Sequence, residues 1–145
     1  DNRGGSVPRL EGIGNYEEAI DIRRKLVNEG RTDLREKVAW SLSNVGSSYM
    51  VVGRSDDALE SYEEAISTYD NLIESGQRAD LRDALAWCLM IRGNIYRDTG
   101  KKELAIADYD QSIQIYISLV EDEGKKELRS DLDRCVTARD KALKE

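Results

Sequence analysis

The chain has 145 residues with a formal net charge of −7, 35% charged residues, a single Pro and no His or Phe. This composition favours an all-α protein over a β-sandwich, and the acidic balance argues against nucleic acid as a partner, because phosphate binding relies on clustered Lys and Arg. The lack of His removes the commonest general base and a common metal ligand, so neither an enzyme nor a cofactor or metal site is expected. The apolar runs are far shorter than the roughly 20 residues that cross a bilayer, so no membrane span is expected.

Helices and the turns between them can be assigned in chain order. Residues 1–13 are rich in Gly and contain the single Pro, which predicts a linker or N-terminal extension. Further along, glycines recur at intervals of 23 or 24 residues and are interpreted as helix C-terminal stops, because the residue after a helix often takes a left-handed conformation. These glycines are Gly30, Gly53, Gly76, Gly100 and Gly124. They divide the chain into six predicted helices.

Two kinds of helix alternate along the chain. Residues 34–49 and 81–96 each carry one apolar stripe at helical spacing, and we call these first-type helices. Residues 55–73 and 101–120 carry a different stripe, rich in Ala and Tyr, and we call these second-type helices. Each first-type helix precedes a second-type helix, which predicts antiparallel pairs.

A repeat of 47 residues relates these segments. It is obeyed by Leu34, Leu81 and Leu128, by Trp40 and Trp87, by Gly46 and Gly93, by Gly53 and Gly100, and by Ala58 and Ala105. The predicted boundaries are a half repeat at 14–30, repeats at 31–76 and 77–124, and a C-terminal capping helix at 125–145. The half repeat is one second-type helix that lacks its first-type partner.

Small and large residues within each repeat stand at the offsets of a tetratricopeptide repeat. In the first repeat they are Leu42, Val45, Gly46, Tyr49, Ala58, Tyr62 and Ala65, and in the second Leu89, Gly93, Tyr96, Ala105, Tyr109 and Ser112. Residues 14–145 therefore resemble this family, with a period longer than the usual 34 and with departures from the pattern at Arg92, where an aliphatic residue is usual, and at Ser112. The resemblance implies an all-α fold of antiparallel helix-turn-helix repeats, stacked as a short right-handed α-solenoid of about six helices.

Glycine inside a helix costs about 1 kcal/mol relative to Ala, so Gly46 and Gly93 need a structural reason. We expect them to let the second-type helix approach closely, with the small side chains of Ala58 and Ala105 doing the same from the facing helix.

The resemblance also implies a function, that of a non-catalytic scaffold that binds a protein partner. In the family, a peptide or a partner helix lies on the concave face, which the first-type helices line. The residues expected on this face are Trp40, Ser43, Ser47, Met50, Trp87, Met90, Asn94, Arg97, Arg134, Thr137 and Lys141. Trp40, Trp87 and Met90 would form its apolar floor, and the basic residues would suit an acidic group. The alternative is that each Trp fills the gap between its long helices, because repeated residues in a solenoid often serve packing.

Cys88 and Cys135 occupy equivalent positions in successive repeats, too far apart for a disulfide, and are interpreted as buried thiols in a reducing compartment, the cytoplasm. Glu63 and Glu64 lie opposite the apolar stripe, which favours a solvated face over acid-base chemistry. Two alternatives to a binding module stay open. One is a structural segment that self-associates through the N-terminal half repeat, and the other is a regulatory domain of a larger multidomain protein.

Overall fold

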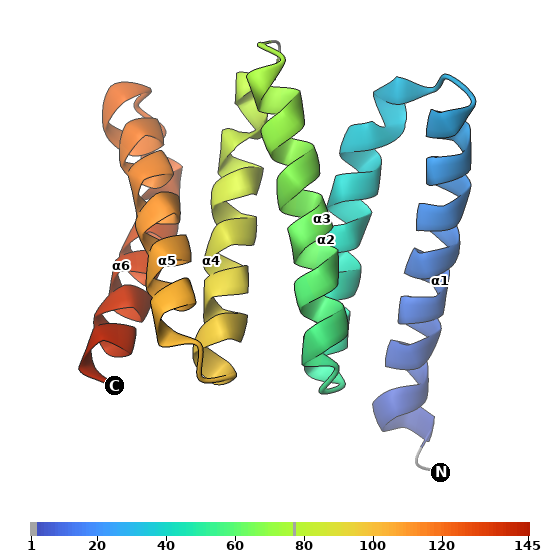
Figure 1. Cartoon of the computed structure of the whole chain (residues 1–145), viewed down its shortest axis with the longest axis horizontal. Helices are drawn as coiled ribbons and strands as arrows, with labels where there is room; N and C mark the ends of the chain where they lie inside the picture. Colours follow the sequence, from blue (N-terminus) through green and yellow to red (C-terminus); the bar gives the residue numbers. More distant parts are fainter. Residues whose placement is uncertain (1–2, 77) are drawn as a thin grey trace. The chain divides into compact units, whose positions relative to one another are not determined.

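The computed structural model describes residues 3–76 and 78–145, with side chains described from residue 12 onward (Figure 1). Across these two ranges the backbone forms helices and short connections and contains no strand. The chain divides into two compact units, Asp1–Asn71 and Leu72–Glu145, and each is described by itself.

The first unit is built from three long helices. These are α1 (Arg3–Asn28), α2 (Arg35–Val51) and the greater part of α3 (Ser55–Glu74), with a short 3-10 helix, η1 (Thr32–Leu34), before α2. α1 packs against α2. α2 also packs against α3, where the ring of Tyr62 lies over Gly46.

The second unit repeats the pattern and adds a final helix. It contains the 3-10 helix η2 (Ala79–Leu81), α4 (Arg82–Asp98), α5 (Lys102–Ile117), the π-helix η3 (Ser118–Asp122), the 3-10 helix η4 (Lys126–Leu128) and α6 (Arg129–Lys144). α5 packs against both α4 and α6, and α4 also contacts α6 (Figure 1). The core of the second unit includes Met90, Tyr109, Tyr116, Leu132 and Cys135.

The helix boundaries confirm the 47-residue repeat. The first-type helices α2, α4 and α6 begin at Arg35, Arg82 and Arg129, each spaced 47 residues from the next, and each follows a 3-10 turn. All five predicted stop glycines have φ between 70° and 108°. This is the left-handed region in which a side chain with a Cβ atom is strained, so the glycines end the helices as the sequence predicts.

Gly76 and Gly124 are 48 residues apart, one more than the repeat of 47. The helical segment that follows α5 accommodates the extra residue. Residues Ser118–Asp122 form a π-helix, whose i→i+5 bonding accommodates an extra residue without a loop.

The two glycines inside helices allow the close helix approach that the sequence predicts. A Cβ atom on Gly46 would lie 2.7 Å from Cε2 of Tyr62, and one on Gly93 would lie 2.9 Å from Cε1 of Tyr109. Each tyrosine ring therefore occupies the space that a side chain would need, and the close approach of paired helices is confirmed in both repeats.

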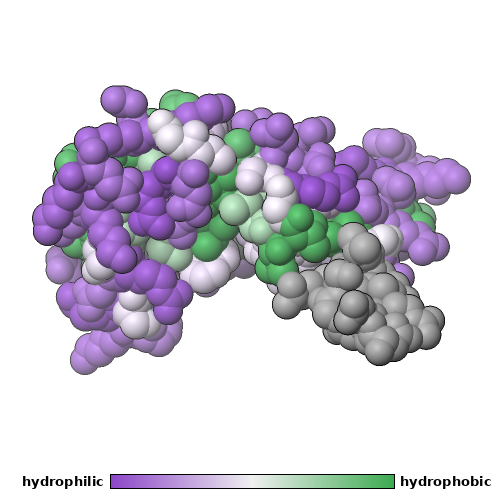
Figure 2. All heavy atoms as spheres, turned by 90° about the horizontal axis from the view of Figure 1, so that it is seen from below, coloured by the Kyte–Doolittle hydropathy of each residue, from purple (hydrophilic) through white to green (hydrophobic). Residues whose placement is uncertain are grey.

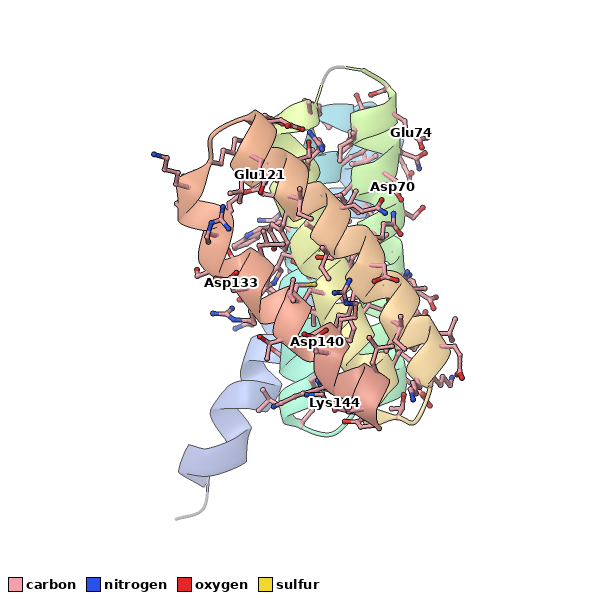
Figure 3. The ribbon with its side chains drawn as sticks, turned by 90° about the vertical axis from the view of Figure 1, so that its left-hand side faces the viewer. Asp70, Glu74, Glu121, Asp133, Asp140 and Lys144 are labelled. Atoms are coloured by element: carbon pink, nitrogen blue, oxygen red, sulfur yellow. The ribbon has the colours of Figure 1, made fainter. Side chains whose placement is uncertain are left out.

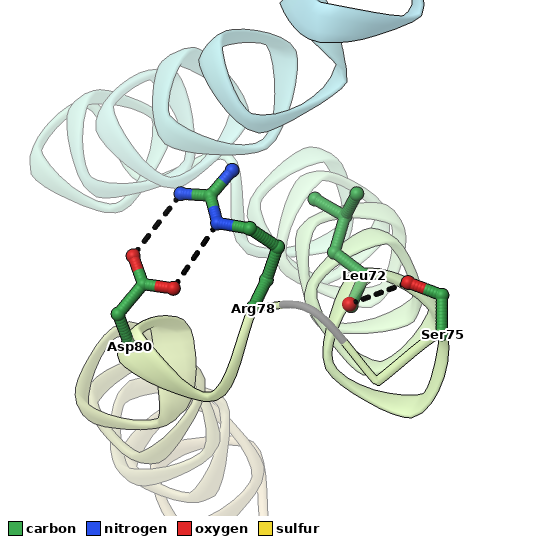
Figure 4. Close-up of polar contacts among 4 residues, drawn as sticks. All are labelled: Leu72, Ser75, Arg78 and Asp80. Atoms are coloured by element: carbon green, nitrogen blue, oxygen red, sulfur yellow. Dashed lines mark hydrogen bonds and ion pairs between the residues drawn. The ribbon is translucent and has the colours of Figure 1, made fainter.

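The same polar turn precedes α2 and α4. Both nitrogens of the Arg78 guanidinium edge bond to Asp80, each at 3.1 Å, and Ser75 donates to the carbonyl of Leu72 at the end of α3 (Figure 4). Arg31 bonds Asp33 in the same way at 3.0 Å. The guanidinium hydrogen bond lowers the pKa of both carboxyl groups. These pairs link the residue before each 3-10 turn to the turn itself at the entry into α2 and α4.

The linker prediction is wrong for residues 3–13, because α1 begins at Arg3; residues 1 and 2 lie outside the described residues. Ile13 is 2% exposed and stands seven residues, about two helical turns, before the buried Ile20. The apolar stripe therefore extends further toward the N-terminus than the glycines and the proline suggest.

Candidate functional site

The two tryptophans on first-type helices are at the surface. The side chain of Trp40 on α2 is 57% exposed and that of Trp87 on α4 is 37% exposed. The alternative in which each tryptophan fills the space between paired helices therefore does not describe this structure. Trp40 belongs to the first unit and Trp87 to the second.

Trp40 borders an open groove in the first unit, with a volume of about 390 Å³. The groove is lined by Gly12, Asn15, Tyr16, Ala19, Arg23, Trp40 and Ser41, from α1 and α2. The guanidinium of Arg23 donates to the hydroxyl of Ser41 and to the carbonyl of Lys37, so the groove has a fixed polar wall beside the indole.

On its α1 side, the groove is formed by residues that match the packing face of α3, the face that a first-type helix covers there. The segment YEEAI occurs at 16–20 in α1 and again at 62–66 in α3. In this register Gly12, Tyr16 and Ala19 correspond to Ala58, Tyr62 and Ala65, each of which is 0% exposed in α3. On α1 the same three positions are partly exposed. A first-type helix covers this face in the complete repeat, and none does so on α1 within the described chain.

Trp87 is accompanied by a cation in the second unit. The guanidinium carbon of Arg134, on α6, lies 6.0 Å from the centre of the Trp87 ring, close enough for a cation-π contact. Thr137 and Lys141, further along α6, are exposed. Trp87, Arg134, Thr137 and Lys141 form what we call the α4–α6 surface.

Several predicted site residues make contacts within their own unit. Ser43 donates to the carbonyl of Trp40, and Arg97 lies 3.7 Å from the carboxylate of Asp98. The exposed Ser47 shares a 2.5 Å hydrogen bond with the hydroxyl of Tyr62. The partly buried Asn94 accepts the same bond from Tyr109, so these two polar side chains join paired helices. Met50 is partly buried.

The prediction for Met90 is wrong. It was expected on the floor of a surface groove, but its side chain is 1% exposed and belongs to the buried cluster that includes Leu132 and Cys135 of α6. The physical reason is that α4 packs against two helices, so a second face of it is buried. Thr137, which is 47 residues later, stays exposed on the last helix.

On the side seen in Figure 2, the described residues at the outer edges are mostly hydrophilic, and hydrophobic residues gather toward the middle. On α6, Asp133, Asp140 and Lys144 are exposed and form part of a charged outer face (Figure 3).

A second pocket, of about 240 Å³, lies between α1, α2 and α3 of the first unit and is separate from the Trp40 groove. Its floor is apolar, with Ile20, Leu42 and Val45. Five carboxylates and one guanidinium also line it, from Glu17, Asp21, Arg24, Asp57, Glu60 and Glu64, together with Tyr49 and Ser61. We call it the acidic pocket.

Three of these carboxylates have partners. The hydroxyl of Tyr49 donates to Glu17 at 3.0 Å, Arg24 pairs with Glu64, and Arg54 pairs with Asp57 at 2.7 Å. Burial, together with the hydrogen bond to Glu17, raises the pKa of Tyr49 to about 12. Tyr49 therefore stays a neutral hydrogen-bond donor at the wall of the pocket over the whole physiological range.

Two segments of the sequence match the family described as tetratricopeptide repeat, one at residues 38–72 and one at residues 88–116. The chain contains tetratricopeptide repeats. Repeats of this family generally serve protein interaction and are generally not catalytic. The matched segments coincide with the helix pairs α2–α3 and α4–α5.

Two solved crystal structures of the protein MamA are also similar to the chain. One is 23% identical, covers 90% of this chain and 88% of MamA, and has a TM-score of 0.23. The other is 24% identical, covers 92% and 91% of the two chains, and has a TM-score of 0.20. No curated protein matches the sequence.

Comparing the two tetratricopeptide repeats position by position identifies the residues that sequence analysis missed. Val45 and Ser61, at the acidic pocket, are replaced 47 residues later by Arg92 and Asp108. The signal was present in the sequence, because Arg92 departs from the family pattern, but its partner on the facing helix is apparent only once the helices are paired.

The remaining expectations concern residues away from these surfaces. Cys88 and Cys135 are free and buried, as predicted, and burial raises the pKa of the Cys88 thiol to about 12. Glu63 and Glu64 are exposed, as predicted. Among the helices described here, none has both the length and the apolar stretch needed to cross a bilayer.

Proposed function

We propose that the chain is a non-catalytic protein-interaction module that binds a partner helix or peptide on its first-type helices. The observation that carries this proposal is the exposed Trp40 beside the open α1–α2 groove. A solvent-exposed tryptophan next to a helix-packing face is a suitable anchor, since aromatic residues that fill or border pockets contribute much of the binding energy at interfaces.

The α4–α6 surface supports the proposal in the second unit. Trp87 and Arg134 combine an aromatic face with a guanidinium, and Lys141 adds positive charge to a chain that is acidic as a whole. Such a surface suits an apolar anchor followed by an acidic group. A cytoplasmic location is part of the proposal and is supported by the two free, buried cysteines.

Self-association is the second candidate, and the uncovered face of α1 favours it. A head-to-tail array would require α6 of one copy to cover α1 of the next. At the position of Gly46 and Gly93, however, α6 has Asp140, so it offers a carboxylate where Tyr16 would need a gap. The chain itself therefore argues against this geometry and favours a different partner.

The test uses the whole chain as bait with the variants W40A and W87A. Both should lose a partner that the wild type retains while keeping their helix content and melting temperature, because both tryptophans are exposed. L104A is the matched control, since Leu104 is a large hydrophobic residue, 50% exposed, on the second-type helix α5.

Equal loss of the partner in L104A would contradict a site on the first-type helices. Unfolding of both tryptophan variants would do the same, because it would assign the tryptophans to packing. Light scattering of the purified chain at high concentration decides the second candidate, and a monomer excludes it.

A further inference from the structure

The acidic pocket of the first unit has more negative charge than its own cations neutralise. Five carboxylates and one guanidinium line it. Among the described residues, Asp21 on α1 and Glu60 on α3 have no ion-pair partner. They approach the pocket from two different helices, so uncompensated charge faces it from two walls.

Ser61 is a second and independent feature of the pocket. Its side chain is 8% exposed and lines the pocket, and within the described residues its hydroxyl has no hydrogen-bond partner. The hydroxyl oxygen itself is not enclosed by protein, so it is open to the pocket and available as a donor or acceptor to a group bound there.

The second repeat shows which chemical group fits at these positions. There, Arg92 replaces Val45 and Asp108 replaces Ser61. The two guanidinium edge nitrogens Nε and Nη2 of Arg92 each donate to one carboxylate oxygen of Asp108 at 2.8 Å. The guanidinium also lies 5.7 Å from the ring centre of Tyr96. In the first repeat the counterpart of this tyrosine, Tyr49, has the guanidinium of Arg54 4.6 Å from its ring centre, and Arg54 pairs with Asp57. The chain therefore supplies a guanidinium between the paired helices only at Arg92, among the described residues of these two repeats, and the position of Val45 has none.

We propose that the acidic pocket of the first unit binds the arginine side chain of a partner protein. The proposal rests on the protein-interaction function proposed above and adds to it a site and a partner chemistry. The pocket shares no lining residue with the groove beside Trp40, so the two sites are distinct.

A guanidinium suits this pocket better than an ammonium group. It is planar and weakly hydrated, so its faces can lie against the apolar floor of Ile20, Leu42 and Val45. Its edge presents several donors in a fixed plane, which can serve Asp21, Glu60 and the Ser61 hydroxyl together. A lysine ammonium is a compact, strongly hydrated charge and gains less from an apolar floor.

The test titrates the isotope-labelled whole chain with acetyl-arginine amide and follows the backbone amide signals by NMR. Saturable shifts are expected at Asp21, Glu60 and Ser61. Acetyl-citrulline amide has nearly the same shape without the charge and should give no saturable shift. Acetyl-lysine amide should bind more weakly than the arginine compound.

Two variants remove the site in different ways. D21N/E60Q neutralises the two unpaired carboxylates with little change of shape and should weaken binding by about tenfold or more, because charge-assisted hydrogen bonds are lost. V45R/S61D installs the ion pair of the second repeat and should abolish binding by filling the pocket. D133N/D140N on α6 is the matched control, since it removes the same charge elsewhere and should leave binding unchanged.

The proposal is overturned if the wild type gives no saturable shift, if citrulline or lysine amide acts as strongly as arginine amide, or if D21N/E60Q binds as tightly as the wild type. Equal weakening in D133N/D140N would overturn it too, because that would indicate non-specific attraction to an acidic chain. None of these results bears on the tryptophan variants, so this proposal and the proposed function can fail separately.

Discussion

Arg92 of α4 and Asp108 of α5 form a bidentate ion pair, with both N–O distances at 2.8 Å, inside the second repeat. The side chain of Asp108 is 7% exposed and that of Arg92 is 20% exposed. The first repeat has Val45 and Ser61 at the equivalent positions. The same position between paired helices is therefore occupied by an ion pair in the second repeat and by two uncharged residues in the first.

We expect D108S to destabilise the second unit by up to about 3–5 kcal/mol, because it removes the largely buried carboxylate that accepts two hydrogen bonds from the Arg92 guanidinium. The loss would appear as a lower midpoint of urea unfolding, followed by circular dichroism. A change below about 0.5 kcal/mol would show that the pair contributes no more than an exposed one.

The double variant R92V/D108S is the control that the chain itself offers. It installs the residues of the first repeat, so no buried charge is left without a partner. Replacing a buried ion pair by apolar residues is often neutral or even stabilising, and we expect most of the loss in D108S to be recovered. A double variant that is less stable than D108S would contradict this reading of the pair.

The glycine of each first-type helix gives a second prediction. In G46A the new Cβ atom would lie 2.7 Å from a ring carbon of Tyr62, which is 0% exposed and cannot move freely. Overpacking of this kind costs about 1–3 kcal/mol, which outweighs the ~1 kcal/mol that Ala gains over Gly inside a helix. The net result should be a lower melting temperature.

G14A is the matched comparison, because Gly14 is also inside a helix but has nothing within 4 Å of its Cβ position. Only the helix propensity changes there, so G14A should be stabilised by up to about 1 kcal/mol. Effects of the same sign in G46A and G14A would show that the contact with Tyr62 is not the reason for the glycine.

The repeat, the helix boundaries and the close approach of paired helices could be predicted because each leaves a local mark in the sequence. Gly53 and Gly100 end their helices whatever those helices pack against. Gly46 and Gly93 are glycines inside helices, which indicates that a neighbouring group comes close to each of them, and in the structure that group is a tyrosine ring. Such features need only the period and the chemistry of single residues.

The site was harder to predict because it depends on how many neighbours each helix has. Met90 was expected at the surface because a single apolar stripe was assumed, whereas α4 contacts both α5 and α6. The N-terminal part of α1 was missed because the glycines and the single proline of residues 1–13 were interpreted as a linker, whereas α1 begins at Arg3. The acidic pocket requires three helices to come together, and no local pattern shows that.

Met90 and Thr137 are equivalent positions in different surroundings, which makes a third prediction. M90A should cost about 2–5 kcal/mol, as expected when a buried Met is truncated and leaves a cavity among α4, α5 and α6. T137A changes an exposed residue on the last helix and should stay within about 0.5 kcal/mol of the wild type. Equal effects would mean that α6 does not cover α4 in solution.

The fourth prediction concerns alkaline pH and follows from buried groups that hold their protons in the folded state. Burial raises the pKa of Cys88 from 9.0 to about 12, and burial likewise raises the pKa of Tyr109 from 10.0 to about 12. The pKa of Tyr116 and that of Cys135 are also raised by burial. In each case the unfolded chain loses its proton at a lower pH than the folded chain. The stabilisation is therefore complete below the unfolded pKa and is lost as the pH rises through the folded pKa.

The melting temperature should accordingly be nearly flat up to about pH 9 and fall steadily from there toward pH 12. In C88A/C135A the first part of this fall should disappear and the decline should start near pH 10, where the tyrosines of the unfolded chain begin to ionise. The double variant will be less stable at every pH because it leaves small cavities, so the comparison is made on the onset of the decline rather than on the melting temperature itself. An unchanged onset would mean that the two thiols do not resist ionisation in the folded protein, and that their burial is less complete than the packing of α4 and α6 indicates.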